Sequence, residues 1–114
     1  MILVIGPRTS GKREYVKTLG YSDADIADAV LDERPVVFNV QDMVARAPES
    51  AMSLLPELLR KEVVICNEVG AGVIPLERSQ RDMREATGRL CVSLAKEAER
   101  VVRLNAGSQQ VIKG

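Results

Sequence analysis

The hydrophobic positions of this sequence form short continuous runs, separated by longer stretches of mixed polarity. Runs at residues 2–5, 36–40 and 63–66 are rich in β-branched residues. Such runs are typical of strands that are buried on both faces of a parallel sheet. Two further strands are predicted at residues 101–104 and 111–113.

The stretches between these runs have the spacing of amphipathic helices. Helices are predicted at residues 12–19, 23–31, 48–61 and 79–99. Gly20 is expected to cap the first at its C-terminus, and Ser22 the second at its N-terminus. Pro48 suits the first turn of the third helix, which Pro56 should kink or restart. Residues 43–47 fit no single element. Strands that alternate with helices predict an α/β fold with a mostly parallel sheet, in a single domain over residues 1–114.

The balance of charges argues against two classes of partner. Sixteen basic and sixteen acidic residues cancel, whereas nucleic-acid and membrane-surface binders usually carry a basic excess. The first apolar run is too short for a signal peptide, and no run approaches the length of a membrane span. We therefore expect a cytoplasmic protein that binds neither nucleic acid nor membrane.

Histidine and cysteine limit the chemistry further. The sequence has no histidine, which excludes a histidine base, nucleophile or metal ligand. Cys66 and Cys91 lie far apart in the sequence among apolar neighbours, so we expect buried free thiols rather than a disulfide or a metal pair. No metal ligands are assigned.

A phosphate-binding loop is predicted after the first strand. Gly6 to Lys12 fits the pattern GxxxxGK, with a strand before it and a helix after it. Glycines allow backbone N–H groups to wrap a phosphate, and Lys12 could reach its outer oxygens. Arg13 stands where such loops usually carry a hydroxyl that binds Mg²⁺; it could contact phosphate or point away. The candidate phosphate-binding residues are Gly6, Arg8, Thr9, Ser10, Gly11, Lys12 and Arg13.

A second loop, "NEVGAGVIP", follows the third apolar run at residues 67–75. It places Asn67 and Glu68 at the carboxyl end of a strand, where open α/β sheets bind their ligands. Gly70 and Gly72 permit a tight turn or a close approach to a ligand. Glu68 could equally be a salt-bridge partner in an ordinary loop.

Several stretches resemble one family. They are "MILVIGPRTSGK" at the start, then "NEVGAGVIP", "REATGRL", "LAKEAERV" and the final "VIKG". Together they resemble the adenosylcobinamide kinase / adenosylcobinamide-phosphate guanylyltransferase family of cobalamin synthesis. The resemblance covers residues 63–114 and the first dozen residues, and is weak between them.

The resemblance implies a P-loop, RecA-like three-layer domain, reduced in size. It implies use of ATP or GTP to phosphorylate a hydroxyl of adenosylcobinamide, and a homotrimer. By motif match, Gly6, Gly11 and Lys12 would hold the nucleotide phosphates, and Asn67, Glu68 and Gly70 would border the same site.

The sequence also departs from the family. Members of the family are longer, and the segment with their guanylylated histidine has no counterpart here, so guanylyl transfer by that route is not expected. An acidic residue usual after the second predicted strand is replaced by Asn39, with Asp42 as a possible substitute. Cys91 and Val92 stand where the family commonly has Asn-Gln.

Three functions stay open at this stage. The first is a cobinamide-type kinase with Lys12, Glu68 and Asp42 as catalytic residues and Arg8 or Arg13 offsetting developing negative charge. The second is an oligomeric module that binds nucleotide, corrinoid or a partner without turnover. The third is a small α/β protein whose loop binds only free phosphate or sulfate.

Overall fold

The computed structural model describes residues 1–7, 11–67, 77–105 and 108–114. In chain order the elements are β1 (Ile2–Gly6), α1 (Lys12–Thr18), the 3₁₀ helix η1 (Asp23–Asp25), β2 (Ile26–Asp28), β3 (Val36–Phe38), α2 (Val40–Arg46), the 3₁₀ helix η2 (Pro48–Leu54), α3 (Leu55–Leu58), β4 (Val63–Asn67), α4 (Arg78–Glu97), β5 (Arg100–Asn105) and β6 (Ser108–Lys113).

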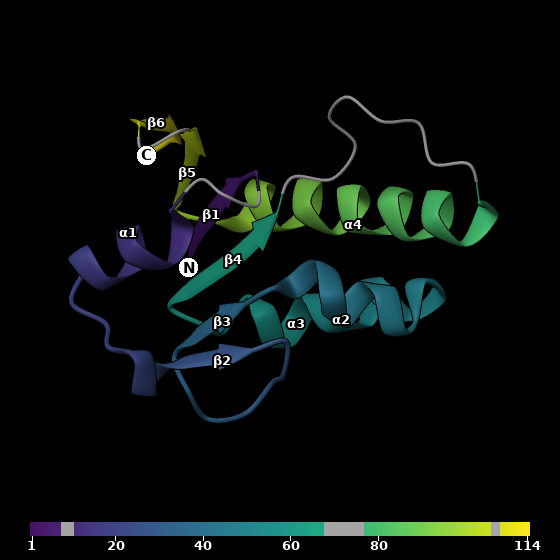
Figure 1. Ribbon diagram of the computed structural model, residues 1–114, viewed down its shortest axis with the longest axis horizontal. Helices are drawn as coiled ribbons and strands as arrows, with labels where there is room; N and C mark the ends of the chain where they lie inside the picture. The colour runs from purple at the N-terminus through teal and green to yellow at the C-terminus, as the bar shows by residue number, and fades with distance from the viewer. Residues whose placement is uncertain (8–10, 68–76, 106–107) are drawn as a thin grey trace.

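The strands form one sheet in the order β2-β3-β4-β1-β5-β6 (Figure 1). Every neighbouring pair is parallel except β5 and β6, which are antiparallel. The expected α/β fold with a mostly parallel sheet is confirmed.

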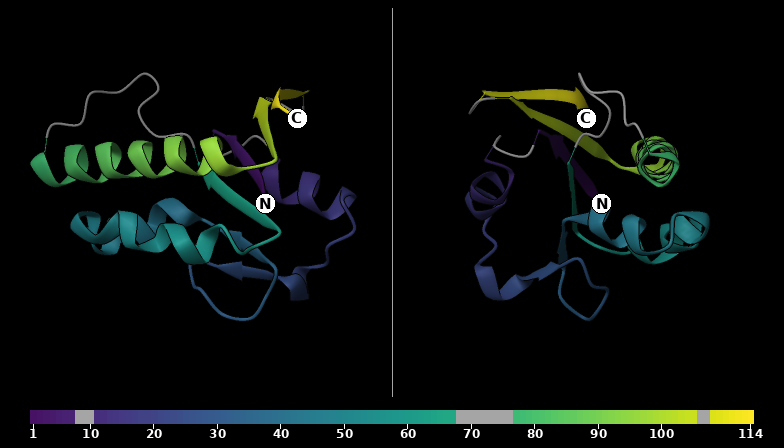
Figure 2. Two further views of the ribbon diagram at one scale, coloured as in Figure 1. Left: turned by 180° about the vertical axis from the view of Figure 1, so that it is seen from behind. Right: turned by 45° about the vertical axis from the view of Figure 1, so that its right-hand side comes forward.

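Helices cover both faces of the sheet, as a parallel sheet requires. Figure 2 shows α1 on one side and α2, α3 and α4 on the other. Successive residues of a strand point to opposite faces, so Leu3 packs in one core cluster with Leu90 of α4, while Val4 packs in another with Val16 of α1. All four side chains are buried.

One helix prediction is wrong. Residues 23–31 contain only the short η1, followed by strand β2. Ile26 and Ala27 are both buried, as expected of a strand covered on both faces, and Ala29 has a φ of 55°, which a right-handed helix does not allow. Ser22 still occupies the N-cap position, now of η1, and its N–H and hydroxyl both donate to the Asp25 carboxylate.

The segment after β3 also differs in detail. Residues 43–47, ambiguous in the sequence, fall mainly in α2, which begins at Val40 where a strand was expected. The helix predicted over 48–61 is split into η2 and α3, and α3 begins at Leu55 with Pro56 in its first turn, as that proline suggested. Gly20 has a φ of 105° directly after the C-cap of α1, which fits its predicted role.

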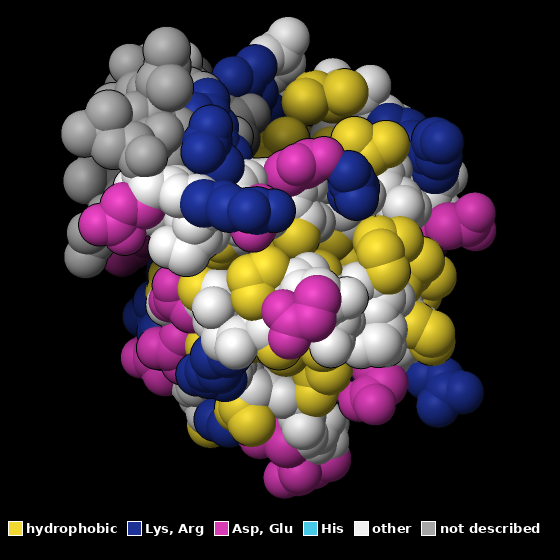
Figure 3. All heavy atoms as spheres, turned by 90° about the vertical axis from the view of Figure 1, so that its right-hand side faces the viewer, with side chains coloured by type: hydrophobic (Ala, Val, Ile, Leu, Met, Phe, Trp, Pro, Cys, Tyr) yellow, Lys and Arg dark blue, Asp and Glu magenta, His cyan; other side chains and the backbone are white. Residues whose placement is uncertain are grey.

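Some apolar side chains remain exposed. Met52 of η2 and Val92 of α4 are 45% and 56% exposed, and the edge strand β6 exposes Val111 and Ile112. Figure 3 shows the end of the molecule at which α4 begins, and the apolar side chains there are mixed with basic and acidic side chains.

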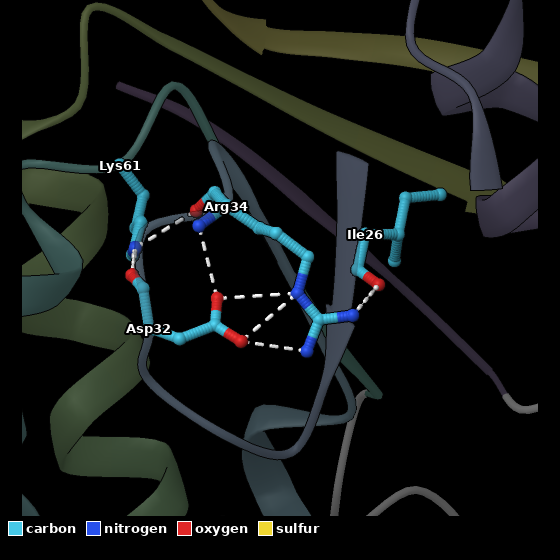
Figure 4. Close-up of polar contacts among 4 residues, drawn as sticks. All are labelled: Ile26, Asp32, Arg34 and Lys61. Atoms are coloured by element: carbon cyan, nitrogen blue, oxygen red, sulfur yellow. Dashed lines mark hydrogen bonds and ion pairs between the residues drawn. The ribbon is translucent and has the colours of Figure 1, made fainter. Parts of the chain in front are cut away.

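An ordered connection replaces a crossover helix between the parallel strands β2 and β3. Crossovers between parallel strands usually need a dozen or more residues, whereas residues 29–35 suffice here. The Arg34 guanidinium binds both carboxylate oxygens of Asp32 and donates to the Ile26 carbonyl (Figure 4). Lys61 donates to the carbonyls of Asp32 and Arg34, and Arg46 donates to that of Ala29. Side chains thus satisfy backbone groups that a helix would otherwise pair internally.

Candidate functional site

Three strand ends define the edge of the sheet at which a site can form. In parallel strands the carboxyl ends lie at one edge, and open α/β sheets bind ligands there. β1 ends at Gly6, β3 at Phe38 and β4 at Asn67. Gly6 pairs directly with Asn67, so the two predicted loops leave the sheet side by side.

Lys12 is the buried cation of this edge. Gly11 has a φ of 80°, a left-handed conformation that favours glycine, and it is the N-cap of α1. Lys12 follows it and is only 3% exposed. Its ammonium group donates to the carbonyls of Pro7 at 2.6 Å and Gly6 at 3.3 Å. The charge is therefore held within the predicted phosphate loop, and Arg8, Thr9 and Ser10 of that loop lie outside the described residues.

Arg13 contacts η1 and the end of β3. Its Nε donates to the Asp23 carboxylate at 3.2 Å, and its guanidinium lies 5.5 Å from the centroid of the Phe38 ring. Hydrogen bonds from Lys17 and Arg13 lower the pKa of Asp23.

A polar pocket opens beside Asn67. Its volume is about 450 Å³, and its walls are Phe38, Asn39, Gln41, Asp42 and Asn67. Asn39 has a φ of 59° at the N-cap of α2, and this turn brings Gln41 and Asp42 to the pocket. Asp42 is exposed and Gln41 is buried. The pocket thus combines a solvent-accessible carboxylate with side-chain amides.

Gln41 organises the pocket, and the sequence analysis missed it. Its carbonyl oxygen accepts the backbone N–H of Asn67 at 3.0 Å, and its amide nitrogen donates to the side chain of Asn39 at 3.1 Å. Asn39 in turn donates to Asp28 at 2.8 Å. The chain of bonds links the ends of β2, β3 and β4. A signal existed, because Gln41 shares a helix face with the buried Val44, where an apolar residue is the usual choice.

The structure brings some predicted site residues together and leaves others apart. Asp42 and Asn67 line the same pocket, whereas Lys12 lies beyond the paired strand ends and is not among its walls. Glu68, Gly70 and Gly72 lie outside the described residues. Within the described part of the chain, no three acidic, cysteine or histidine residues are grouped as a metal site.

Fold and edge together define an α/β protein whose candidate site lies at the carboxyl ends of parallel strands. A comparison with family models extends this to a particular family: residues 24–112 match the model described as "Cobinamide kinase / cobinamide phosphate guanyltransferase". The chain belongs to this family. The match includes the pocket and both sides of the second loop, while the phosphate loop precedes it. No curated protein sequence matches the chain.

Family membership supports a cobinamide kinase or guanyltransferase-like role in cobalamin biosynthesis, with nucleotide-related transferase chemistry. No helix in the described ranges is both long enough and apolar enough to cross a membrane.

Proposed function

We propose that this protein binds ATP or GTP at the loop from Gly6 to Arg13 and transfers a phosphoryl group to a hydroxyl of adenosylcobinamide. The observation that carries this proposal is the pairing of Gly6 with Asn67. It sets a loop that holds a buried lysine beside a polar pocket, in a chain that belongs to the cobinamide kinase family.

Lys12 supplies charge stabilisation. Phosphoryl transfer depends mainly on positioning and on stabilising negative charge as it shifts between oxygens. The ammonium group of Lys12 now donates to two loop carbonyls, which are weaker acceptors than phosphate oxygens. Phosphate binding would exchange these bonds for stronger ones to an anionic acceptor from the same buried position. Removing one such donor typically slows the chemical step by about 100- to 1000-fold.

The pocket beside Asn67 is the proposed acceptor side. Asp42 has an exposed carboxylate there, which can orient the acceptor hydroxyl and accept its proton. Mg²⁺ binds readily to one or two carboxylates together with phosphate oxygens, so Asp42 and Glu68 are the proposed contacts for it. Arg13 offers no oxygen to the ion. Mg²⁺ dependence is therefore expected to be weaker than in loops that carry a hydroxyl there.

The guanylyl-transfer half of the family's name is not proposed for this chain. Transfer through a guanylylated histidine needs a histidine, and this sequence has none. The proposed product is the phosphorylated corrinoid, released without further reaction.

A binding module without turnover is the second candidate. It is favoured by Asn39, which stands where the family usually has an acidic residue, and by the engagement of Arg13 with Asp23. A module of this kind would bind nucleotide or corrinoid through the same residues and leave both unchanged.

Calorimetric titration distinguishes these candidates. ATP and GTP are titrated with and without Mg²⁺ into the wild type, Lys12→Ala and the control Lys17→Ala, an exposed lysine of the same helix. We expect nucleotide binding to depend on Lys12 and to survive in Lys17→Ala. A kinase assay with adenosylcobinamide follows, and a rate unchanged in Lys12→Ala contradicts the proposed chemistry. Binding without phosphorylated product favours the module, and no binding at millimolar nucleotide rejects the kinase and a nucleotide-binding module.

We also propose a homo-oligomer, a trimer by resemblance to the family. The domain is small, and small domains gain stability by burying surface in an assembly. The exposed apolar residues Met52, Val92, Val111 and Ile112 give it surface to bury. Sedimentation at micromolar concentration tests the assembly, and a monomer there counts against it.

A further inference from the structure

The two cysteines, distant in the sequence, face each other in the fold. Cys66 lies in β4 and Cys91 in α4, 25 positions apart in the sequence, and their sulfur atoms are 3.5 Å apart. Neither cysteine is in a disulfide bond in this structure. Cys66 is buried, as expected, whereas Cys91 is only partly buried.

The surroundings hold these thiols in place. Cys66 is fully buried in the core cluster between the sheet and α4, and Cys91 packs against the same cluster. Leu90 and Leu94 on either side of Cys91 are also buried there, so this face of α4 is fixed against β4. A disulfide bond has a sulfur–sulfur distance of about 2.05 Å. The two sulfurs already touch, and a small side-chain movement would join them.

We propose that Cys66 and Cys91 form a reversible intramolecular disulfide when the protein meets an oxidised low-molecular-weight disulfide such as oxidised glutathione. The cross-link joins the end of β4 to the middle of α4. The bond would enclose the chain from Cys66 to Cys91, which includes the second loop, in a covalent ring. It would also fix the end of β4 next to Asn67. Neither the bond nor its effect on stability depends on the proposed kinase function.

The reaction balances through two exchanges. Cys91, the partly exposed thiol, attacks first: its thiolate forms a bond to one glutathione sulfur, and the other sulfur leaves and takes up the proton. Cys66 then attacks the sulfur of Cys91, and the second glutathione leaves with the proton of Cys66. Two protein thiols are oxidised, and one glutathione disulfide is reduced to two thiols. The neighbouring Cys91 thiol, together with burial, raises the pKa of Cys66, which supports Cys91 as the first nucleophile.

The test uses the whole folded chain, which is incubated in glutathione buffers with an increasing fraction of oxidised glutathione. The reaction is then quenched with acid, and the mass of the protein is measured by mass spectrometry. We expect the wild type to lose two hydrogen atoms with no glutathione retained. The oxidised form should unfold at a temperature higher by on the order of 10 °C, because the cross-link restricts the unfolded chain.

Two variants test the assignment. Cys91→Ser should show no mass loss, and Cys66→Ala should retain glutathione on Cys91. The control is Cys91→Ser combined with Val92→Cys, which moves the thiol to an exposed neighbouring position of the same helix. That thiol should carry glutathione and form no internal bond.

Three results would overturn the proposal. They are a wild type that only retains glutathione, a wild type that only forms disulfide-linked dimers, and a Val92→Cys control that loses two hydrogen atoms as readily as the wild type.

Discussion

The buried amide of Gln41 allows a sharp test of the bonding that shapes the pocket. Replacing Gln41 with methionine keeps the length of the side chain and removes both of its hydrogen bonds. The N–H of Asn67 then loses its acceptor, and a buried donor without a partner costs about 1–3 kcal/mol. Loss of the bond to Asn39 adds about 0.5–1.5 kcal/mol. We expect the free energy of unfolding to fall by about 1.5–4.5 kcal/mol.

Urea unfolding followed by circular dichroism measures this change. The matched control is Gln80→Met, an exposed glutamine of α4, which should change stability by less than about 0.5 kcal/mol. A double-mutant cycle with Asn39→Gly isolates the bond between the two side chains, because glycine tolerates the positive φ at that position. The expected coupling is about 1 kcal/mol. If Gln41→Met were as stable as Gln80→Met, the N–H of Asn67 would be satisfied by water and the bonding scheme would be wrong.

Two further predictions concern charged side chains. Arg13→Ser should leave the affinity for nucleotide without Mg²⁺ nearly unchanged, because Arg13 contacts Asp23 and Phe38. In calorimetry the same substitution should increase the gain in nucleotide affinity that Mg²⁺ provides. A tenfold or greater loss of affinity without Mg²⁺ would mean that Arg13 binds phosphate. Hydrogen bonds from Arg34 lower the pKa of Asp32 in the folded protein, so its contribution to stability is full above the unfolded pKa of about 3.9 and is lost as the pH falls through the folded pKa. In urea unfolding the stability gap between wild type and Asp32→Asn should therefore narrow below about pH 4, and a constant gap would contradict the role of this ion pair.

Much of the sheet could be predicted because its strands carry a strong local signal. The runs that became β1, β3 and β4 are continuous and apolar, as buried parallel strands are. β2 was not predicted because Ile26, Ala29 and Val30 also fit the spacing of a helix. What decides its structure is pairing with β3, a contact that the local pattern does not contain.

The sequence predicts a site at the level of loops and not of contacts. Strand-end glycines and Lys12 can be recognised in the sequence, because their chemistry depends on local spacing. The partners of Arg13 cannot, since Asp23 and Phe38 reach it only through the packing of α1 against the sheet. The meeting of Cys66 with Cys91 has the same origin, as it depends on where α4 crosses β4.

The central position of β1 has a consequence for the order of folding. β1 precedes the other described strands in the chain, and its two neighbours, β4 and β5, begin at Val63 and Arg100. Contacts between such distant segments form late and slow the folding of a domain. During synthesis, β1 therefore gains its first neighbour only after β4 has emerged and its second only after β5 has emerged. The centre of the sheet is thus completed late, although its first strand is made early.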